Sequence, residues 1–181
     1  MTLFIDTHNE KITVALLSEK VFISQKETNH EHSKYVLNMI KTLLEENNYN
    51  KSDIDEIIVV NGPGSFTGIR IGVVIAKTLS YTLNVKIKTI SSLETFGISE
   101  NAEFDIIALD DTKGSYFMAK DFKNPKYLPK DVFEDYIREN NYTVSKNKNY
   151  DFKRIYEYSK SLDYIDPKNV NPIYIKRLNV W

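Results

Sequence analysis

The sequence has no cysteine among its 181 residues. A disulfide framework, a thiolate metal site and a catalytic thiol are therefore excluded. Neither sign of charge prevails, because 24 lysines and arginines stand against 25 acidic residues and the formal net charge is −1. Such a balance gives the chain no general attraction to nucleic acid or to a membrane surface. Any binding of RNA would then depend on charge that a partner supplies.

Long hydrophobic runs are also missing. The longest apolar run, residues 72–76, is far too short to span a bilayer. The N-terminal residues lack the basic segment and the long apolar stretch of a signal peptide. We therefore expect a soluble cytoplasmic protein that has no contact with a membrane.

The first half of the chain has the pattern of one compact α/β unit. Three short β-type runs, separated by polar turns, open the sequence and predict an antiparallel meander. A segment with helical spacing follows, then a buried strand, a glycine-rich turn, a second apolar helix and another strand. This order, β-β-β-α-β-α-β, is typical of a ribonuclease-H-like unit. The expected ranges are 2–6, 11–18, 21–25, 32–48, 55–60, 61–80 and 85–90.

The second half begins like the first, which indicates an internal repeat. Residues 4–16 can be aligned with residues 108–120, and this alignment matches Asp6 with Asp110. Two ribonuclease-H-like units in tandem form the architecture of the actin, Hsp70 and sugar-kinase superfamily. We therefore predict an α/β protein with an actin-like fold, divided near Asn101 into lobes 1–100 and 101–181. The second lobe is shortened, with a proline-bounded loop after Phe122 and helices at 131–140 and 152–162.

The glycine-rich turn invites a phosphate-binding interpretation that its spacing does not support. Gly68 is followed by Ile69 and Arg70, whereas a P-loop needs lysine and then serine or threonine. The glycine spacing does not match the Gly-x-Gly-x-x-Gly pattern of a dinucleotide-binding turn. Ser65 does not stand in the Gly-x-Ser-x-Gly pattern of a nucleophile elbow. A tight turn that leads into a capped helix remains. The helix amides beside Gly64 are a weak candidate for binding an anion.

The helix after the turn has a stripe of small side chains. Gly68, Gly72, Ala76 and Ser80 recur every four residues and lie on one face. An interior glycine costs a helix about 1 kcal/mol relative to alanine, so a need for space would explain its presence. The rest of the helix is apolar nearly all round, which predicts burial on more than one side. Either the chain's own segments or a second protein chain would cover it.

Asp6 and Asp110 are the other weak candidates for a ligand site. Enzymes with the actin fold hold magnesium and phosphate on one acidic residue in each of two hairpin turns, with glycines beside them. Here the first turn has no glycine, and the second has only Gly114. We therefore expect both aspartates to terminate strands, and we expect no ATP, magnesium or other cofactor.

The histidines do not form a metal site. A helical metal pair needs histidines four residues apart, but Val36 stands four residues after His32. His30 and His32 are two residues apart, and no third ligand is evident beside them, since His8 lies elsewhere in the sequence. At the C-terminus, Lys176, Arg177 and Trp181 have the character of a docking tail. No residue in the chain is expected to be catalytic.

Taken together, several motifs resemble the bacterial TsaB family, also called YeaZ. The segment NGPGSFTGIRIGVVIAKTLS, followed by ISSLE, is similar to the family's signature. FIDTHNEKITVAL, HSKYVLNMI, IALDDTKGSYFMA and the terminal PIYIKR follow in the family's order. The resemblance covers most of residues 1–120 and about the last ten residues, whereas residues 123–169 match poorly.

The resemblance implies a two-lobed actin-like fold without catalytic capacity. In that family TsaB is the partner of the catalytic subunit TsaD, and with the ATPase TsaE they transfer a threonylcarbamoyl group to the adenosine next to the anticodon of tRNA. The heterodimer uses the first two helices of each subunit, and homodimers use similar surfaces. The implied interface residues here are Tyr35, Met39, Gly68, Ile71, Gly72, Ile75, Ala76 and Leu79.

Two hypotheses follow. The preferred one is a scaffold subunit that binds a TsaD-like paralogue and a TsaE-like ATPase, performs no chemistry and meets tRNA only through the complex. The alternative is an enzyme in its own right, either an actin-fold ATPase or phosphotransferase, or a metal-dependent peptidase-like protein. Its motivating residues are Asp6, Asp110 and the glycine turn.

Overall fold

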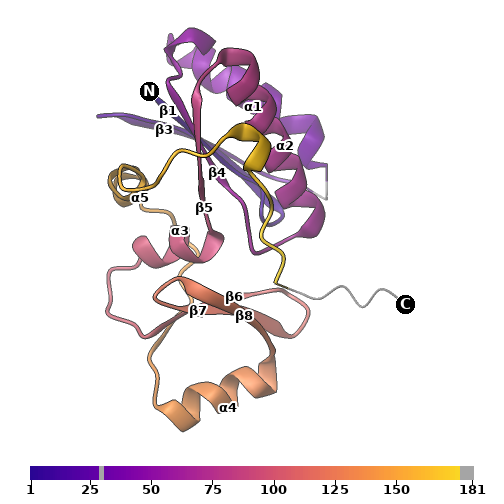
Figure 1. The fold of residues 1–181 in the computed structure, drawn as a ribbon, viewed down its shortest axis with the longest axis vertical. Helices are drawn as coiled ribbons and strands as arrows, with labels where there is room; N and C mark the ends of the chain where they lie inside the picture. Colours follow the sequence, from indigo (N-terminus) through magenta and orange to yellow (C-terminus); the bar gives the residue numbers. More distant parts are fainter. Residues whose placement is uncertain (29–30, 176–181) are drawn as a thin grey trace.

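The computed structural model describes residues 1–28 and 31–175. His30 and the C-terminal residues Lys176, Arg177 and Trp181 lie outside the described residues. The chain forms two mixed sheets stacked end to end, with helices on both flanks of the first (Figure 1). The expected two-lobed α/β architecture is confirmed.

The first sheet has the strand order β3-β2-β1-β4-β5. Its strands β1 to β3 form the expected antiparallel meander, and β4 and β5 pair in parallel beside β1. The residues of β1 are all buried, which fits a central strand covered on both faces. The bounds are β1 Thr2–Asp6, β2 Lys11–Leu17, β3 Val21–Glu27, β4 Glu56–Val60 and β5 Lys86–Ile90.

Two helices cover one face of this sheet. In α1 (His32–Glu46), the predicted helix, the stripe formed by Val36, Ile40, Leu43 and Leu44 is buried. In α2 (Phe66–Leu83) the Ser65 hydroxyl accepts a hydrogen bond from the amide of Gly68, which makes it the N-cap. A one-turn 3₁₀ helix, η1 (Lys51–Asp53), connects α1 to β4. None of the helices in the described part of the chain combines the length and the hydropathy that crossing a membrane requires.

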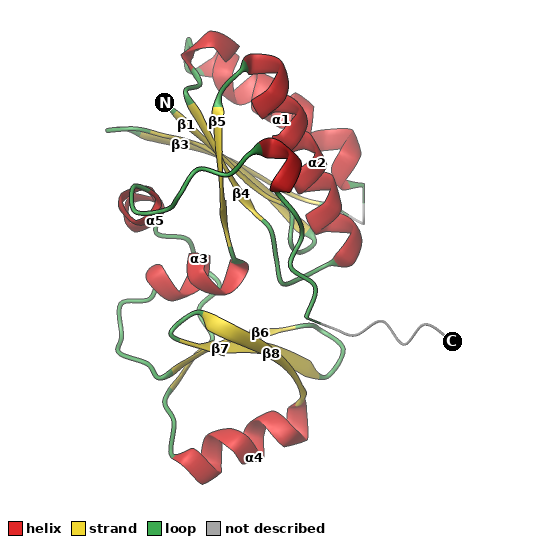
Figure 2. Ribbon diagram, viewed as in Figure 1, coloured by secondary structure: helices red, strands yellow, loops and turns green. Residues whose placement is uncertain are grey.

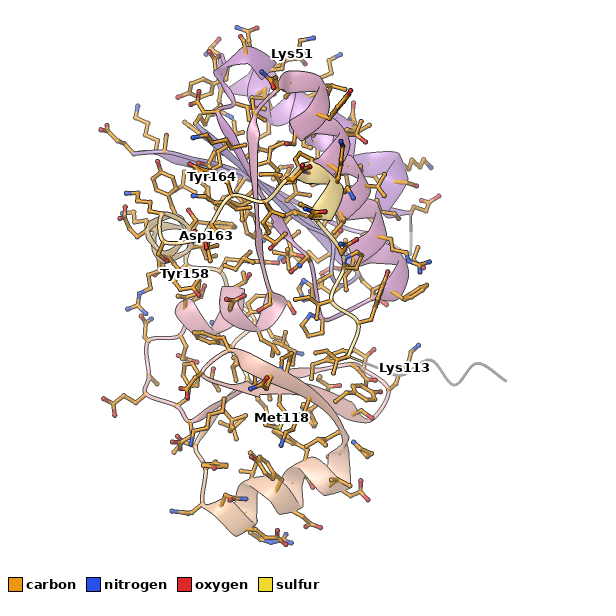
Figure 3. The ribbon with its side chains drawn as sticks, in the orientation of Figure 1. Lys51, Lys113, Met118, Tyr158, Asp163 and Tyr164 are labelled. Carbon is orange, nitrogen blue, oxygen red and sulfur yellow. The ribbon has the colours of Figure 1, made fainter. Side chains whose placement is uncertain are left out.

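The second sheet has the order β8-β7-β6-β9. Its two faces are covered by α3 (Ser92–Ile98), which lies between the sheets, and by α4 (Lys130–Asn140) at the far end (Figure 2). Met118 lies between this sheet and α4, and Lys113 lies at the tip of the turn that faces the first lobe (Figure 3). The strands are β6 Ile106–Asp110, β7 Ser115–Lys120, β8 Lys123–Pro129 and β9 Val144–Ser145.

One expected loop is a strand. Residues 123–129 were predicted as a proline-bounded loop, but they form β8 at the edge of the second sheet. An edge strand tolerates Pro125 and Pro129 because half of its amides need no partner in the ladder. Prolines at this spacing therefore exclude a central strand but not an edge strand.

The chain returns to the first lobe after β9. Helix α5 (Phe152–Ser159) packs Phe152 and Ile155 against Phe4 and Ile58 of the first sheet. Residues 161–175 then pass over α2, with the 3₁₀ helix η2 (Pro167–Asn169) on the way. The expected second lobe, residues 101–181, is therefore shared between two cores. Its part up to β9 forms the second sheet, whereas the segment after β9 completes the core of the first lobe.

Candidate functional site

A cleft of about 680 Å³ separates the two lobes. Its walls come from the turn after β1, the glycine turn before α2, the turn between β6 and β7, and residues 173–175. This is the carboxyl end of the parallel strands, where open α/β sheets bind ligands. Of the weak candidates, Asp110 and Gly64 line the cleft, whereas Asp6 does not.

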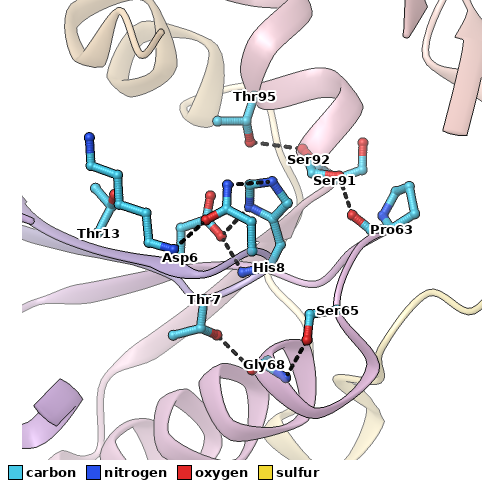
Figure 4. A network of polar contacts seen from close by, with 12 residues as sticks. Asp6, Thr7, His8, Thr13, Pro63, Ser65, Gly68, Ser91, Ser92 and Thr95 are labelled. Carbon is cyan, nitrogen blue, oxygen red and sulfur yellow. Dashed lines mark hydrogen bonds and ion pairs between the residues drawn. The ribbon is translucent and has the colours of Figure 1, made fainter. Parts of the chain in front are cut away.

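Asp6 is fully buried beside His8 (Figure 4). Its two carboxylate oxygens are occupied by the chain itself. Oδ1 accepts hydrogen bonds from the backbone amide of His8 at 2.9 Å and pairs with His8 Nδ1 at 2.8 Å. Oδ2 accepts the hydroxyl of Tyr150 at 3.0 Å. A metal ion at Asp6 would have to displace at least one of these partners.

The surroundings of Tyr150 favour the protonated form of its hydroxyl, which can donate a hydrogen bond. Burial, and then the negative charge of Asp6, raise the pKa of the Tyr150 hydroxyl well above its ordinary value. Its ring stacks on Phe152 at 5.1 Å and lies 5.0 Å from the ring of Phe96 in α3. Tyr150 therefore contacts the core of each lobe at the point where they meet.

Asp110 has a different environment from Asp6. It is exposed, and its Oδ1 accepts a hydrogen bond from the amide of Thr112 at 2.6 Å. The next residue, Asp111, accepts the amides of Lys113 and Ser115 and thereby closes the turn. The two aspartates of the repeat thus do not face each other across the cleft as a matched pair.

The glycines of the turn make room for the chain's own backbone. A Cβ atom on Gly64 would lie 2.4 Å from the carbonyl oxygen of His8, and one on Gly62 would lie 2.8 Å from that of Ile173. The amide of Ser65 donates to the carbonyl of His8 at 2.6 Å, so this helix-entry amide is already satisfied. The turn is shaped for close packing, and the space beside its glycines is filled.

The small-residue stripe of α2 faces the chain's own sheet. A Cβ on Gly68 would lie 2.1 Å from the carbonyl oxygen of Thr7, and one on Gly72 would lie 2.3 Å from Thr7 Oγ1. Thr7 Oγ1 also donates to the carbonyl of Gly68 at 2.7 Å, and Ala76 is fully buried. The expectation that Gly68, Gly72 and Ala76 receive a partner's helix is therefore wrong, because Thr7 occupies that groove.

The other expected interface residues divide by position. Met39 belongs to the buried core, and half-buried Tyr35 lies on the β3 side of α1, where Lys26 Nζ stands 4.5 Å from its ring centre. Ile71, Ile75 and Leu79 are half-buried on α2. These three and the half-buried Tyr35 keep part of their surface exposed and are compatible with the expected interface, whereas Met39 faces the first lobe itself.

The outer face of α2 has an exposed ridge instead. Phe66, Arg70, Val74 and Thr78 recur every four residues on the solvent side, and Tyr81 lies beside them. Val74 is 60% exposed, and Leu37 is the exposed large apolar residue of α1. We call these six residues the outer ridge.

Metal ligands do not gather in the described part of the chain, where no three histidine or acidic side chains could hold an ion. His32 is buried, and its Nε2 lies 2.6 Å from the carbonyl oxygen of Asn9. Its hydrogen bond fastens the start of α1 to the turn after β1.

Comparison with known proteins identifies the chain's relatives. Residues 16–149 match the family model described as TsaD, tRNA N6-adenosine threonylcarbamoyltransferase. The protein named tRNA threonylcarbamoyladenosine biosynthesis protein TsaB of Bacillus subtilis is 41% identical over 95 residues, and that of Escherichia coli is 34% identical over 94 residues. The chain belongs to the TsaB/YeaZ family.

The solved structures agree with this assignment at the level of the fold. YeaZ from Pseudomonas aeruginosa superposes with a TM-score of 0.75 and 19% identity, covering 96% of this chain and 98% of that one. A second P. aeruginosa structure, titled as similar to peptidase YEAZ, gives 0.79 at 19% identity. The actin-like fold expected from the sequence is thus confirmed. The TsaB sequence match spans only 51% of this chain and 42% of the B. subtilis relative.

The outer ridge of this TsaB-like chain was not predicted from its sequence. A signal was present, since Phe66, Arg70 and Val74 share one face that lies about 160° around the helix from the glycine stripe. Because α2 is apolar nearly all round, periodicity alone does not tell which face meets the sheet. The contact of Thr7 with Gly68 and Gly72 decides it.

Proposed function

We propose that this chain is a non-catalytic subunit that binds a TsaD-like threonylcarbamoyltransferase and supports its modification of the adenosine next to the anticodon of tRNA. The relatives from B. subtilis and E. coli are named as threonylcarbamoyladenosine biosynthesis proteins. The observation that carries the proposal is Asp6, whose two oxygens are engaged by His8 and Tyr150. The acidic residue that an actin-fold catalyst would offer to magnesium is therefore withdrawn from the cleft.

The proposed docking surface is the outer ridge together with the half-buried Ile71 and Ile75. It exposes apolar and aromatic side chains on two neighbouring helices, next to an arginine. Aromatic residues and arginine are enriched at protein interfaces, whereas a helix that faces water is normally polar. The occupant is the TsaD-like paralogue, since the family's heterodimer pairs the first two helices of each subunit. A TsaE-like ATPase and tRNA would join through that complex.

The test is co-elution of the purified chain with the TsaD-like subunit from the same genome. Val74→Asp places a charge in the middle of the surface and should abolish co-elution. Val132→Asp is the matched control, because Val132 is 47% exposed on α4 of the other lobe. Co-elution that survives Val74→Asp and retains the wild-type stoichiometry would overturn the proposed surface.

A nucleotide-binding enzyme remains the second candidate, since the cleft volume and the exposed Asp110 favour it. Asp110 lines the cleft together with Lys11, Lys113 and Lys148, groups that suit a phosphate and its metal ion. Gly64 lies on the opposite wall. Direct titration with nucleotide separates the two candidates.

A further inference from the structure

Arg70 is held in place by two aromatic side chains. Its guanidinium carbon lies 3.7 Å from the ring centre of Phe66, one helical turn earlier, and 5.5 Å from that of Tyr174. Its Nε donates to the hydroxyl of Tyr174 at 2.7 Å. The two rings lie 5.0 Å apart, so they brace the exposed guanidinium together.

This arrangement leaves the terminal nitrogens of Arg70 available. Among the described residues the arginine ion pairs are Arg138–Asp135 and Arg154–Asp151, and Arg70 forms none. A guanidinium stays charged and presents its N–H groups in a planar fork that fits a carboxylate with two hydrogen bonds. Stacking and the Tyr174 hydroxyl fix that fork beforehand, so a ligand has less side-chain entropy to remove.

The position of Arg70 connects it to the proposed docking surface. It stands between Phe66 and Val74 on the outer ridge, and Ile71 is its neighbour in the sequence. An arginine braced by aromatic side chains inside an apolar patch has the composition of an interface hot spot. Docking would remove water from the guanidinium and strengthen its attraction to an opposite charge.

We infer that Arg70 fixes the position of the TsaD-like partner by a two-pronged ion pair with a carboxylate on that partner. This inference rests on the proposed function. Phosphate of RNA fits the surroundings less well, because a phosphate backbone needs several free cations along its track. Lys77, the other cation on α2, donates to the carbonyls of Lys168 and Val170 and is not free for that purpose.

The inference also assigns a role to Tyr174 as a positioning residue. Its hydroxyl orients the Nε edge of Arg70, so the terminal nitrogens point away from it. Tyr174→Phe keeps the ring and loses only that hydrogen bond. Its effect on partner binding should therefore be smaller than that of Arg70→Lys and should vanish when Arg70 is already replaced.

The experiment measures the affinity of the full chain for the TsaD-like subunit by isothermal titration. Arg70→Lys keeps the charge but loses the fork, and it should weaken binding by about tenfold or more. Arg154→Lys is the matched control on α5 and should bind as the wild type does. The double variant Arg70→Lys/Tyr174→Phe should bind as weakly as Arg70→Lys alone, and thermal unfolding checks that each variant is folded.

The outcomes separate this inference from the proposed function. Arg70→Lys that binds like the wild type, while Val74→Asp does not bind, overturns the inference and leaves the proposed function standing. Binding by Val74→Asp as well overturns the proposed function. An Arg70→Lys variant that keeps its affinity for the protein, but whose complex loses affinity for tRNA, overturns the carboxylate assignment in favour of RNA phosphate.

Discussion

The hydroxyl of Tyr150 lies 3.0 Å from Asp6 Oδ2, although 144 residues separate the two in the chain. Asp6 ends the first strand, and Tyr150 begins the segment that returns from the second lobe. This hydrogen bond fastens the returning segment to the first sheet and occupies a carboxylate that an actin-fold enzyme would use. The bond that stabilises the chain here is thus also one that a metal ion at Asp6 would have to displace.

Tyr150→Phe should lower the free energy of unfolding by about 2 kcal/mol, the cost of leaving a buried charged group short of one hydrogen bond. The ring and its stacking on Phe152 remain in this variant. Urea unfolding of the variant and the wild type measures the difference. Tyr156→Phe is the control, since its ring packs in the same apolar cluster. Equal losses in both variants would contradict a special role for the bond to Asp6.

The raised pKa of the same hydroxyl determines how the free energy of unfolding should change at alkaline pH. The pKa of Tyr150 is raised well above its usual value by burial and by Asp6, and that of Tyr158 is raised to about 12 by burial and by Glu94. Folded chains therefore hold these protons where unfolded chains release them. Their stabilising contribution is complete below about pH 10, the unfolded value for tyrosine, and is lost as the pH rises through the folded values.

Unfolding measured between pH 9 and about pH 12 tests this dependence. The wild type should lose stability steadily above about pH 10, and the double variant Tyr150→Phe/Tyr158→Phe should lose less over the same interval. Identical slopes for the two proteins would show that other groups govern the alkaline transition.

The glycine stripe supplies a prediction about packing. Gly72→Ala should lower the free energy of unfolding by about 1–3 kcal/mol, because its Cβ would overlap Thr7 Oγ1. Removing that oxygen with Thr7→Ala should make the alanine at position 72 less costly. A double-mutant cycle should therefore give a favourable coupling between the two positions. Purely additive losses would mean that α2 shifts away from the sheet instead.

The sequence predicted the elements well because their hydrophobic periodicity is strong. Helix α1, the buried strand β4 and helix α4 were all expected within a few residues of their observed bounds. The repeat of Asp6 over Asp110 likewise indicated two related sheets, and both aspartates end the first strand of their sheet.

Which face of α2 packs against the sheet could not be predicted in the same way. Small residues every four positions permit a close approach, but the sequence does not say whether the sheet or a partner approaches. Thr7 decides the matter by inserting against Gly68 and Gly72. The bond of Tyr150 to Asp6 was equally out of reach, since nothing local marks a contact between residues so far apart.

Nucleotide titration tests the second candidate function. Because His8 and Tyr150 occupy Asp6, the wild type should release no measurable heat with ATP and magnesium at concentrations up to about millimolar, a level that corresponds to roughly 4 kcal/mol of binding free energy. Micromolar binding that is lost in Asp110→Asn would instead support a nucleotide-binding enzyme. Lys160→Gln is the control for nonspecific charge effects, since Lys160 lies near Met1 and Lys86 at the amino end of the parallel strands, away from the cleft.

The most direct test of the scaffold account is a reconstituted modification assay with the TsaD-like and TsaE-like subunits from the same genome. It compares threonylcarbamoyl transfer to tRNA in the presence of Asp110→Asn, which alters the cleft, and of Val74→Asp, which alters the docking surface. The account predicts transfer at the wild-type rate with Asp110→Asn and almost none with Val74→Asp. Transfer that is lost with Asp110→Asn and retained with Val74→Asp would contradict it.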